Sequence, residues 1–325
     1  MRIARNPFVK ALAVGVLVSG ILFGCKKDGE TGGGGTAQPK TAADVVKEDA
    51  NYSIFQAALT RANLTDALKA TNLTVFLPNN AAFQASGFAD AAAISALPVA
   101  TAESIVNYHV LNGKVAVADI PGGTNVSVQT KGGQSAYITK TTSGTVATVS
   151  INGAKVVTPD VQSANGILHV IDRVLVPPTT TMLDAAKADP ANFSLVVAAI
   201  NRASTVNPTL TLLLSSSTSA PVTVFLPDNA AMTAAGLTAA AINSLSPTAL
   251  SALMSYHTTN SLLFSSQLAA GQLLMFSGGK VTVTASATGT ATLKGTKNTT
   301  AVNIKRANWL TTNGIIHVID QVLQQ

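Results

Sequence analysis

The chain of 325 residues is long enough for two or three domains, and 47% of it is hydrophobic, which excludes an intrinsically disordered protein. Charged residues make up only 11%, so much of the polar surface must come from Thr, Ser, Asn and Gln, which suit strands and loops. The net charge of +6 does not indicate a nucleic-acid partner, because three of the 21 basic residues precede the first apolar segment and no basic run interleaved with aromatics follows.

The first 25 residues have the pattern of a bacterial export signal. Three basic residues precede an apolar stretch of 14 residues, Ala11–Gly24, which is shorter than the roughly 20 residues that a membrane span needs. The stretch ends in LFGC at residues 22–25, which resembles the lipobox of bacterial lipoproteins. That resemblance implies that Cys25 receives a diacylglycerol, becomes the new amino terminus and is then acylated, for example with palmitate. Membrane lipid is therefore an expected partner, and an uncleaved signal anchor is the alternative.

Residues 26–40 have the composition of a flexible, Gly-rich linker. They include four consecutive glycines, Gly32–Gly35, and almost no apolar side chain. A coil of this length has an end-to-end distance of roughly 20 Å, which would hold a folded part clear of the lipid headgroups. We therefore expect a membrane-anchored lipoprotein at the outer membrane or cell surface, with a periplasm-facing orientation as the alternative.

Three sequence blocks occur twice, at an offset of 148 or 149 residues. Residues 74–83, TVFLPNNAAF, recur as residues 223–232, TVFLPDNAAM; Tyr108-His109 recur as Tyr256-His257; residues 165–172, NGILHVID, recur as residues 313–320, NGIIHVID. Three blocks that share one offset cannot plausibly be accidental, and a unit of about 140 residues is an ordinary domain size. The repeat predicts two tandem domains, at residues 41–177 and 181–325.

An amphipathic helix is predicted early in each copy. Apolar residues recur at helical spacing within residues 54–62 and again within residues 195–200, and Arg61 matches Arg202 at an offset of 141 residues. The smaller offset means that the second copy holds about eight extra residues before its TVFLP segment, in Leu210–Pro221. We expect this insertion to be a surface loop, because lengthening a loop costs little free energy.

Strands are predicted on both sides of the Tyr-His pairs. TVFLP indicates a short buried strand that ends at proline, and Asn79 or Asp228 can cap the helix that follows. An Ala-rich helical region leads to Tyr-His, and Val- and Thr-rich strands separated by Gly pairs come next. Asn-Gly then turns the chain into a closing strand, predicted over Ile167–Val176 and Ile315–Leu323.

The three repeated blocks, in this order, resemble the fasciclin domain. The resemblance covers about Thr41–Pro177 and Thr181–Gln325, nearly all of the chain after the linker. It implies an α+β fold of two tandem fasciclin-like domains, each a β-wedge or sandwich packed with several helices. It also implies extracellular adhesion, with an extracellular protein or glycan as the ligand.

The resemblance further implies where a partner would bind. In animal members of the family, integrin binding has been linked to the Tyr-His region and to an Asp-Ile pair just before the closing block. The matching candidates for partner contact are Tyr108, His109, Tyr256, His257, Asp160 and Val161, with Trp309 added from the second copy. The second copy has Asn308-Trp309 in place of the Asp-Ile pair, so the acidic contact does not carry over to it.

A structural role competes with partner contact at each of these positions. His169 and His317 lie in near-continuous apolar strands, where we favour a buried neutral imidazole bonded to backbone. The Tyr-His pairs are also favoured as core residues, because a tyrosine ring fills core volume while its hydroxyl finds a partner. Asp160 follows a proline and is typical of a turn. Trp309 is left open between core residue and exposed contact.

The sequence offers no support for an enzyme. Cys25 is the only cysteine, which excludes an internal disulfide, a cysteine zinc site and a cysteine nucleophile in the folded part. No nucleophile elbow, HExxH helix, phosphate-binding glycine loop or useful pair of carboxylates occurs. We therefore expect no catalytic residue, metal or cofactor. Adhesion through surface proteins or glycans is the leading function, and a periplasm-facing protein that binds a polysaccharide or small ligand is the alternative.

Overall fold

The computed structural model describes residues 39–218, 220–285 and 291–325. The predicted signal peptide, its Cys25 and all but the last two residues of the predicted linker lie outside these described residues. Within the part of the chain that is described, no helix combines the length and the apolar character that a membrane crossing requires.

The chain from Pro39 onward contains two copies of one mixed arrangement, each with a seven-stranded sheet and several helices, which confirms the predicted α+β class. The helices of the first copy are α1 (Ala42–Glu48), η1 (Ala50–Tyr52), α2 (Ser53–Arg61), η2 (Thr65–Lys69), α3 (Asn80–Ala85), α4 (Ala91–Ser95) and α5 (Val99–Tyr108). Its strands are β1 (Leu73–Pro78), β2 (Val110–Asn112), β3 (Gly123–Gln129), β4 (Ser135–Ser143), β5 (Val146–Ile151), β6 (Ala154–Gln162) and β7 (Gly166–Ile171).

The second copy repeats the strands and the five α-helices of the first; it also has α8 and the 3-10 helix η3, whereas η1 and η2 occur only among the described residues of the first copy. Its helices are α6 (Met182–Lys187), α7 (Pro190–Ala203), α8 (Pro208–Ser215), α9 (Asn229–Ala234), α10 (Ala239–Ser244), α11 (Pro247–Tyr256) and η3 (Ser265–Gln267). Its strands are β8 (Val222–Pro227), β9 (Thr258–Thr259), β10 (Gly271–Leu274), β11 (Lys280–Thr284), β12 (Thr292–Lys294), β13 (Val302–Thr311) and β14 (Gly314–Ile319).

The two sheets have the same strand order. It runs β2-β1-β7-β6-β5-β4-β3 in the first copy and, read in the same direction, β9-β8-β14-β13-β12-β11-β10 in the second. Only the pairs β1 with β7 and β8 with β14 are parallel; the other pairs are antiparallel. The repeated TVFLP and HVID blocks thus lie side by side as the second and third strands from one edge of each sheet.

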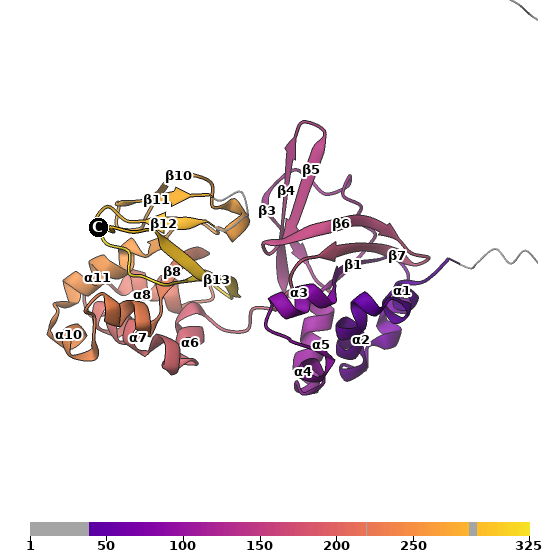
Figure 1. The fold of residues 1–325 in the computed structure, drawn as a ribbon, viewed down its shortest axis with the longest axis horizontal. Helices are drawn as coiled ribbons and strands as arrows, with labels where there is room; N and C mark the ends of the chain where they lie inside the picture. Colours follow the sequence, from indigo (N-terminus) through magenta and orange to yellow (C-terminus); the bar gives the residue numbers. More distant parts are fainter. Residues whose placement is uncertain (1–38, 219, 286–290) are drawn as a thin grey trace, which may run out of the picture. The chain divides into compact units, whose positions relative to one another are not determined.

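Strand β1 divides two cores because alternate side chains of a strand point to opposite faces. Leu73, Val75 and Leu77 belong to a core shared with the helices, whereas Phe76 belongs to a second core between the two halves of the folded sheet. In Figure 1, helices α1 to α5 lie on one side of β1 and β7, with strands β3 to β5 on the other. All six residues of β1 are buried, which explains why the strand is apolar at consecutive positions.

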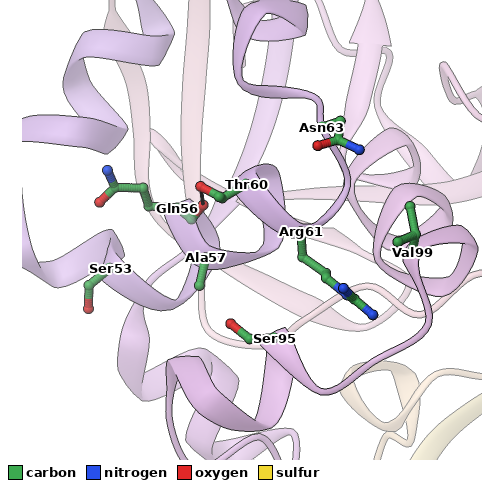
Figure 2. A pocket seen from close by; sticks show the side chains of 8 residues that line it. All are labelled: Ser53, Gln56, Ala57, Thr60, Arg61, Asn63, Ser95 and Val99. Atoms are coloured by element: carbon green, nitrogen blue, oxygen red, sulfur yellow. Dashed lines mark hydrogen bonds between the residues drawn. The ribbon is translucent and has the colours of Figure 1, made fainter.

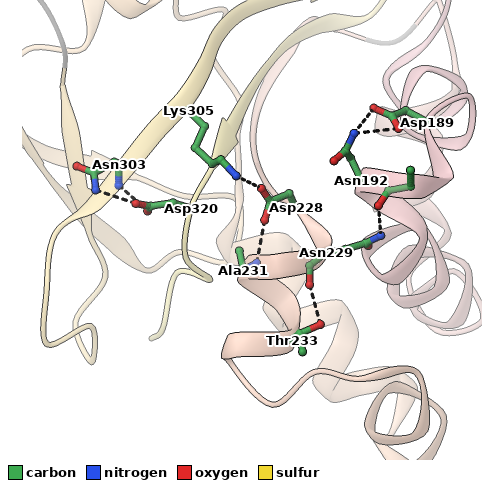
Figure 3. Close-up of polar contacts among 10 residues, drawn as sticks. Asp189, Asn192, Asp228, Asn229, Ala231, Thr233, Asn303, Lys305 and Asp320 are labelled. Carbon is green, nitrogen blue, oxygen red and sulfur yellow. Dashed lines mark hydrogen bonds and ion pairs between the residues drawn. The ribbon is translucent and has the colours of Figure 1, made fainter.

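The predicted helix caps after the TVFLP strands are confirmed. The Oδ1 atoms of Asn79 and Asp228 accept hydrogen bonds from the N–H groups of Ala82 and Ala231, each at 2.8 Å. Asp228 differs from its counterpart in that its Oδ2 also pairs with Lys305 of β13, as Figure 3 shows. The first copy has Asn79 in the place of Asp228 and an exposed Val157 in the place of Lys305. The acidic and the basic side chain of this pair are therefore both specific to the second copy.

The prediction of a surface loop within Leu210–Pro221 is wrong for the first part of that segment. Residues 208–215 form helix α8, which Asn207 caps by accepting from the N–H of Leu210 at 3.1 Å and which has proline at its start. Leu210 and Leu214, four residues apart, are buried in the helix-side core of the second copy. The first part of the segment is therefore helical because Leu210 and Leu214 share one buried face, a pattern hidden by the Ser and Thr residues that follow.

The closing strands are shorter than predicted. β7 ends at Ile171 and β14 at Ile319, although Leu175 and Leu323 are also buried. The N–H of Leu175 donates to a ring nitrogen of His109 instead of to a strand neighbour. The prediction extended the strand because apolar character continues, whereas the backbone has already left the sheet.

Candidate functional site

The Tyr108-His109 pair lies at the end of helix α5, with both side chains 0% exposed. The hydroxyl of Tyr108 donates to the carbonyl of Ser135 at 2.8 Å and accepts from the Nδ2 of Asn152 at 2.9 Å. Burial raises the pKa of Tyr108, so its hydroxyl stays protonated. The ring and its hydroxyl therefore tie α5 to the sheet.

The ring of His109 makes two backbone hydrogen bonds. Nε2 accepts from the N–H of Leu175 at 2.9 Å, which leaves the proton on Nδ1, and Nδ1 donates to the carbonyl of Ile105 at 2.8 Å. Burial lowers the pKa of His109 to about 4. A neutral imidazole is the form that satisfies both neighbours, so His109 holds the segment after β7 against α5.

The second copy reproduces these contacts. Tyr256 donates from its hydroxyl to the carbonyl of Lys280 at 2.7 Å, and the ring of His257 lies between Leu253 O at 2.8 Å and Leu323 N at 2.9 Å. Tyr256 is 1% exposed and His257 0%. Burial also lowers the pKa of His257 to about 4.

The second histidine of each copy is equally enclosed. Nδ1 of His169 accepts from the N–H of Asp160 at 3.2 Å, and its Nε2 donates to Val115 O at 2.9 Å. His317 has the same arrangement with Asn308 and Leu263, at 3.3 and 2.9 Å. Burial lowers the pKa of His317 to about 4.

Asp160 and Asn308 occupy the same bulge in equivalent strands. Each has a left-handed backbone, with φ of 56° and 60°, a conformation that Asp and Asn tolerate better than other side chains. The Oδ1 of Asp160 accepts from Val117 N at 2.9 Å, and that of Asn308 accepts from Ser265 N at 2.7 Å. Both side chains are half-buried, so each fixes a loop while keeping some exposed surface.

Val161 and Trp309 follow these bulge residues and are also half-buried. Val161 packs against the helix-side core of the first copy. The ring of Trp309 lies 5.8 Å from that of Phe193, and the guanidinium of Arg306 stands 4.2 Å from its centroid. Burial lowers the pKa of Arg306. Trp309 therefore packs on one face and is partly open to solvent, and its role as a partner contact stays a prediction.

These positions do not form an acid-base or metal-binding site in this arrangement. Among the described residues, no group of three or more His, Cys, Asp or Glu side chains could hold a metal ion. Both nitrogens of each histidine ring are engaged by backbone, and a general base needs a free nitrogen within reach of a substrate. The Tyr-His side chains serve the core here, and partner contact through any of the seven candidate residues stays a prediction.

A cavity that the sequence analysis missed lies in the first copy. It has a volume of about 580 Å³ and is lined by residues of α2, α4 and α5 and by one residue after α2: Ser53, Gln56, Ala57, Thr60, Arg61, Asn63, Ser95 and Val99. Figure 2 shows the side chain of Arg61 between Ser95 and Val99. The repeated arginine was visible in the sequence, but its neighbours on α4 and α5 come together only in the fold.

The fasciclin domain family model matches residues 50–177 and 191–325. The chain is 33% identical over 156 residues to Protein sll1483 of Synechocystis, which is 44% of this chain and 77% of that protein. It is 34% identical over 126 residues to Immunogenic protein MPB70 of Mycobacterium bovis, 36% of this chain and 55% of that one. It is also 32% identical over 139 residues to Transforming growth factor-beta-induced protein ig-h3 of Sus scrofa, 42% of this chain but 19% of that one.

A solved structure is also similar, that of a FAS1 domain pair from the insect cell adhesion molecule Fasciclin I. The similarity has a TM-score of 0.38 at 23% identity, and covers 84% of this chain and 96% of that one. Since the family match spans both copies, the chain belongs to the fasciclin domain family and carries two of its domains.

Proposed function

We propose that this protein is a membrane-anchored, extracytoplasmic adhesion or binding protein that engages surface proteins or glycans through its two fasciclin domains. The observation that carries the proposal is the family match over both copies. The engagement of all four histidines by backbone supports a binding role over acid-base catalysis.

The anchor in this proposal is the predicted acylation of Cys25. Two domains on one tether can bind a repetitive ligand with a higher effective concentration than one domain, provided that the ligand spans both. Labelled palmitate should be incorporated into the wild-type protein and not into Cys25→Ala. The same variant should leave the membrane fraction; a Cys25→Ala protein that stays in that fraction would contradict the anchor.

Adhesion is tested on intact cells. A deletion strain should lose attachment or aggregation, and re-expression of the wild-type chain should restore it. Re-expression of Cys25→Ala, which keeps both folded domains, should not. Unchanged attachment of the deletion strain on protein-coated and glycan-coated surfaces would contradict adhesion.

The alternative is a periplasm-facing protein that binds a polysaccharide or small ligand, and the cavity beside Arg61 is compatible with a ligand in either orientation. Protease treatment of intact cells separates the two orientations. A surface protein is digested under this treatment, whereas an inward-facing one is digested only after the outer membrane is opened. Opened cells therefore serve as the control that both orientations can be cleaved.

A further inference from the structure

The cavity beside Arg61 is lined by one face of helix α2. Ser53, Gln56, Ala57, Thr60 and Arg61 stand at positions i, i+3, i+4, i+7 and i+8, which share a face of a helix. The opposite face, with Ile54, Phe55, Ala58 and Leu59, is buried in the core, so this face is the solvent side of the helix. It is mainly polar, and α4 and α5 border it with Ser95 and Val99 without closing it.

The guanidinium of Arg61 is held in place by the backbone, and its positive charge is available to a ligand. Its Nε donates to the carbonyl of Leu97 at 2.7 Å, which fixes the plane of the guanidinium. Among the described residues Arg61 forms no ion pair, and the cavity lining contains no carboxylate. The two terminal nitrogens therefore offer donors in the fork geometry that suits a carboxylate, and little ordering is needed before binding.

The rest of the lining suits a polyhydroxylated ligand. The hydroxyls of Thr60 and Ser95 donate to the carbonyls of Gln56 and Ala91, at 3.0 and 2.8 Å, which leaves their oxygens as acceptors. Val99 is 41% exposed and gives an apolar surface next to these groups. A mixture of hydroxyl, amide and small apolar groups matches a sugar ring, which has hydroxyls on its rim and C–H groups on its faces.

The second copy keeps the arginine and most polar positions of this lining, with Ser194, Asn201 and Asn243 in place of Ser53, Thr60 and Ser95, but it differs at two others. Nη2 of Arg202 donates to Leu245 O at 2.8 Å, so the structural bond to the equivalent carbonyl is preserved. Val197 replaces Gln56, and Pro247 replaces Val99. Val197 packs against the helix-side core of its own domain. The backbone hydrogen bond of the arginine is thus common to both copies, whereas the amide of Gln56 and the exposed side chain of Val99 belong to the first.

We propose that the cavity of the first domain binds an acidic sugar unit of a polysaccharide, with its carboxylate on Arg61 and its hydroxyls on Gln56, Thr60 and Ser95. This inference rests on the proposed function and specifies its ligand. A glutamate-rich peptide would offer the same carboxylate, but its backbone presents one N–H donor per residue to the acceptor oxygens of Thr60 and Ser95, whereas a sugar unit presents several hydroxyls.

The test measures calorimetric binding of oligogalacturonate to the purified full-length protein. Wild type should bind oligogalacturonate, and should bind a neutral oligosaccharide of equal length or a tetraglutamate peptide much more weakly. Arg61→Gln should weaken oligogalacturonate binding at least about tenfold, since it removes a charge-assisted hydrogen-bonded pair. Tighter binding of the peptide than of the sugar, or equal binding of the neutral sugar, would overturn the proposal.

Two further variants separate binding from folding. Arg202→Gln breaks the equivalent structural bond in the second copy and should leave oligogalacturonate binding unchanged. Gln56→Val introduces the residue that the second copy already carries, and it should weaken binding several-fold without lowering the melting temperature. Equal loss in Arg61→Gln and Arg202→Gln, or full binding by both Arg61→Gln and Gln56→Val, would refute a site at this cavity.

Measuring cell attachment separates a failure of the acidic-sugar assignment from a failure of the adhesive function on which it rests. If the deletion strain loses attachment but the wild-type protein binds no oligogalacturonate, the acidic-sugar assignment is wrong and adhesion stands. If binding depends on Arg61 but the deletion strain attaches normally, the site stands and the adhesive function is wrong.

Discussion

Nε2 of His257 accepts a hydrogen bond at 2.9 Å from the backbone N–H of Leu323, 66 residues further along the chain. Through its other nitrogen the same ring donates to Leu253 O, so one side chain joins helix α11 to the segment that follows β14. His109 makes the same connection between Ile105 and Leu175. Each domain is closed by a neutral imidazole placed between two backbone groups.

Replacing His257 by leucine should destabilise the second domain by about 2–4 kcal/mol, because a buried N–H and a buried carbonyl lose their partners. Trp309 is the only tryptophan in the chain, so its fluorescence reports unfolding of the second domain. The urea midpoint of that signal should fall in His257→Leu. His109→Leu is the matched control in the first domain and should shift the Trp309 midpoint less; an unchanged midpoint in His257→Leu would contradict the role of the ring.

Stability of the second domain should decrease as the pH falls from about 6.5 towards 4. Burial lowers the pKa values of His257 and His317 to about 4, so the unfolded chain takes up protons in this window while the folded domain does not. Above pH 6.5 the imidazoles are neutral in both the folded and the unfolded state, so the histidines do not make the stability depend on pH. Below pH 4 they are protonated in both states, and the loss of stability is complete.

The pH effect is measured as the urea midpoint of Trp309 fluorescence from pH 7.5 to 4. Each histidine can contribute up to about 3 kcal/mol of this loss, from the usual cost of a shift of two to three pKa units. A His257→Gln variant should start from a lower midpoint and lose less of it over the same range. A flat profile between pH 6.5 and 4.5 would show that the rings are not held neutral.

Much of the fold could be predicted from the sequence because the strongest signals were local and duplicated. The TVFLP strands, their Asn79 and Asp228 caps and the helix over residues 54–62 depend on neighbouring residues, and each appears in the structure. Helix α8 was missed because the segment Leu210–Pro221 was interpreted as polar as a whole, on account of the Ser and Thr residues that follow the helix, although four of the eight residues of α8 are leucine.

The candidate sites could be predicted from the sequence less completely than the fold. The buried Tyr-His pairs were interpreted correctly as core, because an aromatic residue and a histidine at the end of an apolar helix have few other places to lie. The cavity depends on the approach of Ser95 and Val99 to Arg61 across residues distant in the chain, which no periodicity encodes. The pairing of Asp228 with Lys305 likewise needs the register of β13.

The ion pair between Asp228 and Lys305 should add little to the stability that Asp228 already provides as the N-cap of helix α9. Lys305 is about half exposed, and such ion pairs contribute up to about 1 kcal/mol. Asp228→Asn keeps the acceptor for Ala231 N–H, as Asn79 does in the first copy, and should cost no more than this. Asp228→Ala removes the cap as well and should cost about 1 kcal/mol more.

The ion pair can be isolated with a double-mutant cycle. Lys305→Val copies Val157 of the first copy, so the double variant Asp228→Asn with Lys305→Val restores a combination that the fold already uses. Urea unfolding of the two single variants and of the double variant should give a coupling energy of about 0.5–1 kcal/mol that shrinks at 1 M salt. Strict additivity would show that the two side chains do not interact.

Asp160 offers a way to separate partner contact from folding, because the second copy already carries its neutral equivalent. Asn308 has the same left-handed backbone and accepts from the equivalent backbone N–H. Asp160→Asn should therefore change stability by less than about 0.5 kcal/mol, whereas Asp160→Ala loses the acceptor and tolerates the backbone poorly, at a cost of about 1–3 kcal/mol.

If the carboxylate of Asp160 contacts a partner, Asp160→Asn should reduce attachment of complemented deletion cells while the purified protein melts at the wild-type temperature. Asn308→Asp is the reciprocal variant, and it should leave the fold intact while it offers the second domain the acidic group it lacks. Wild-type attachment by Asp160→Asn, together with a loss in Asp160→Ala that tracks its lower melting temperature, would assign Asp160 to the fold alone. The contact surface would then have to be sought at Trp309 or at the cavity beside Arg61, where side chains are at least partly open to solvent.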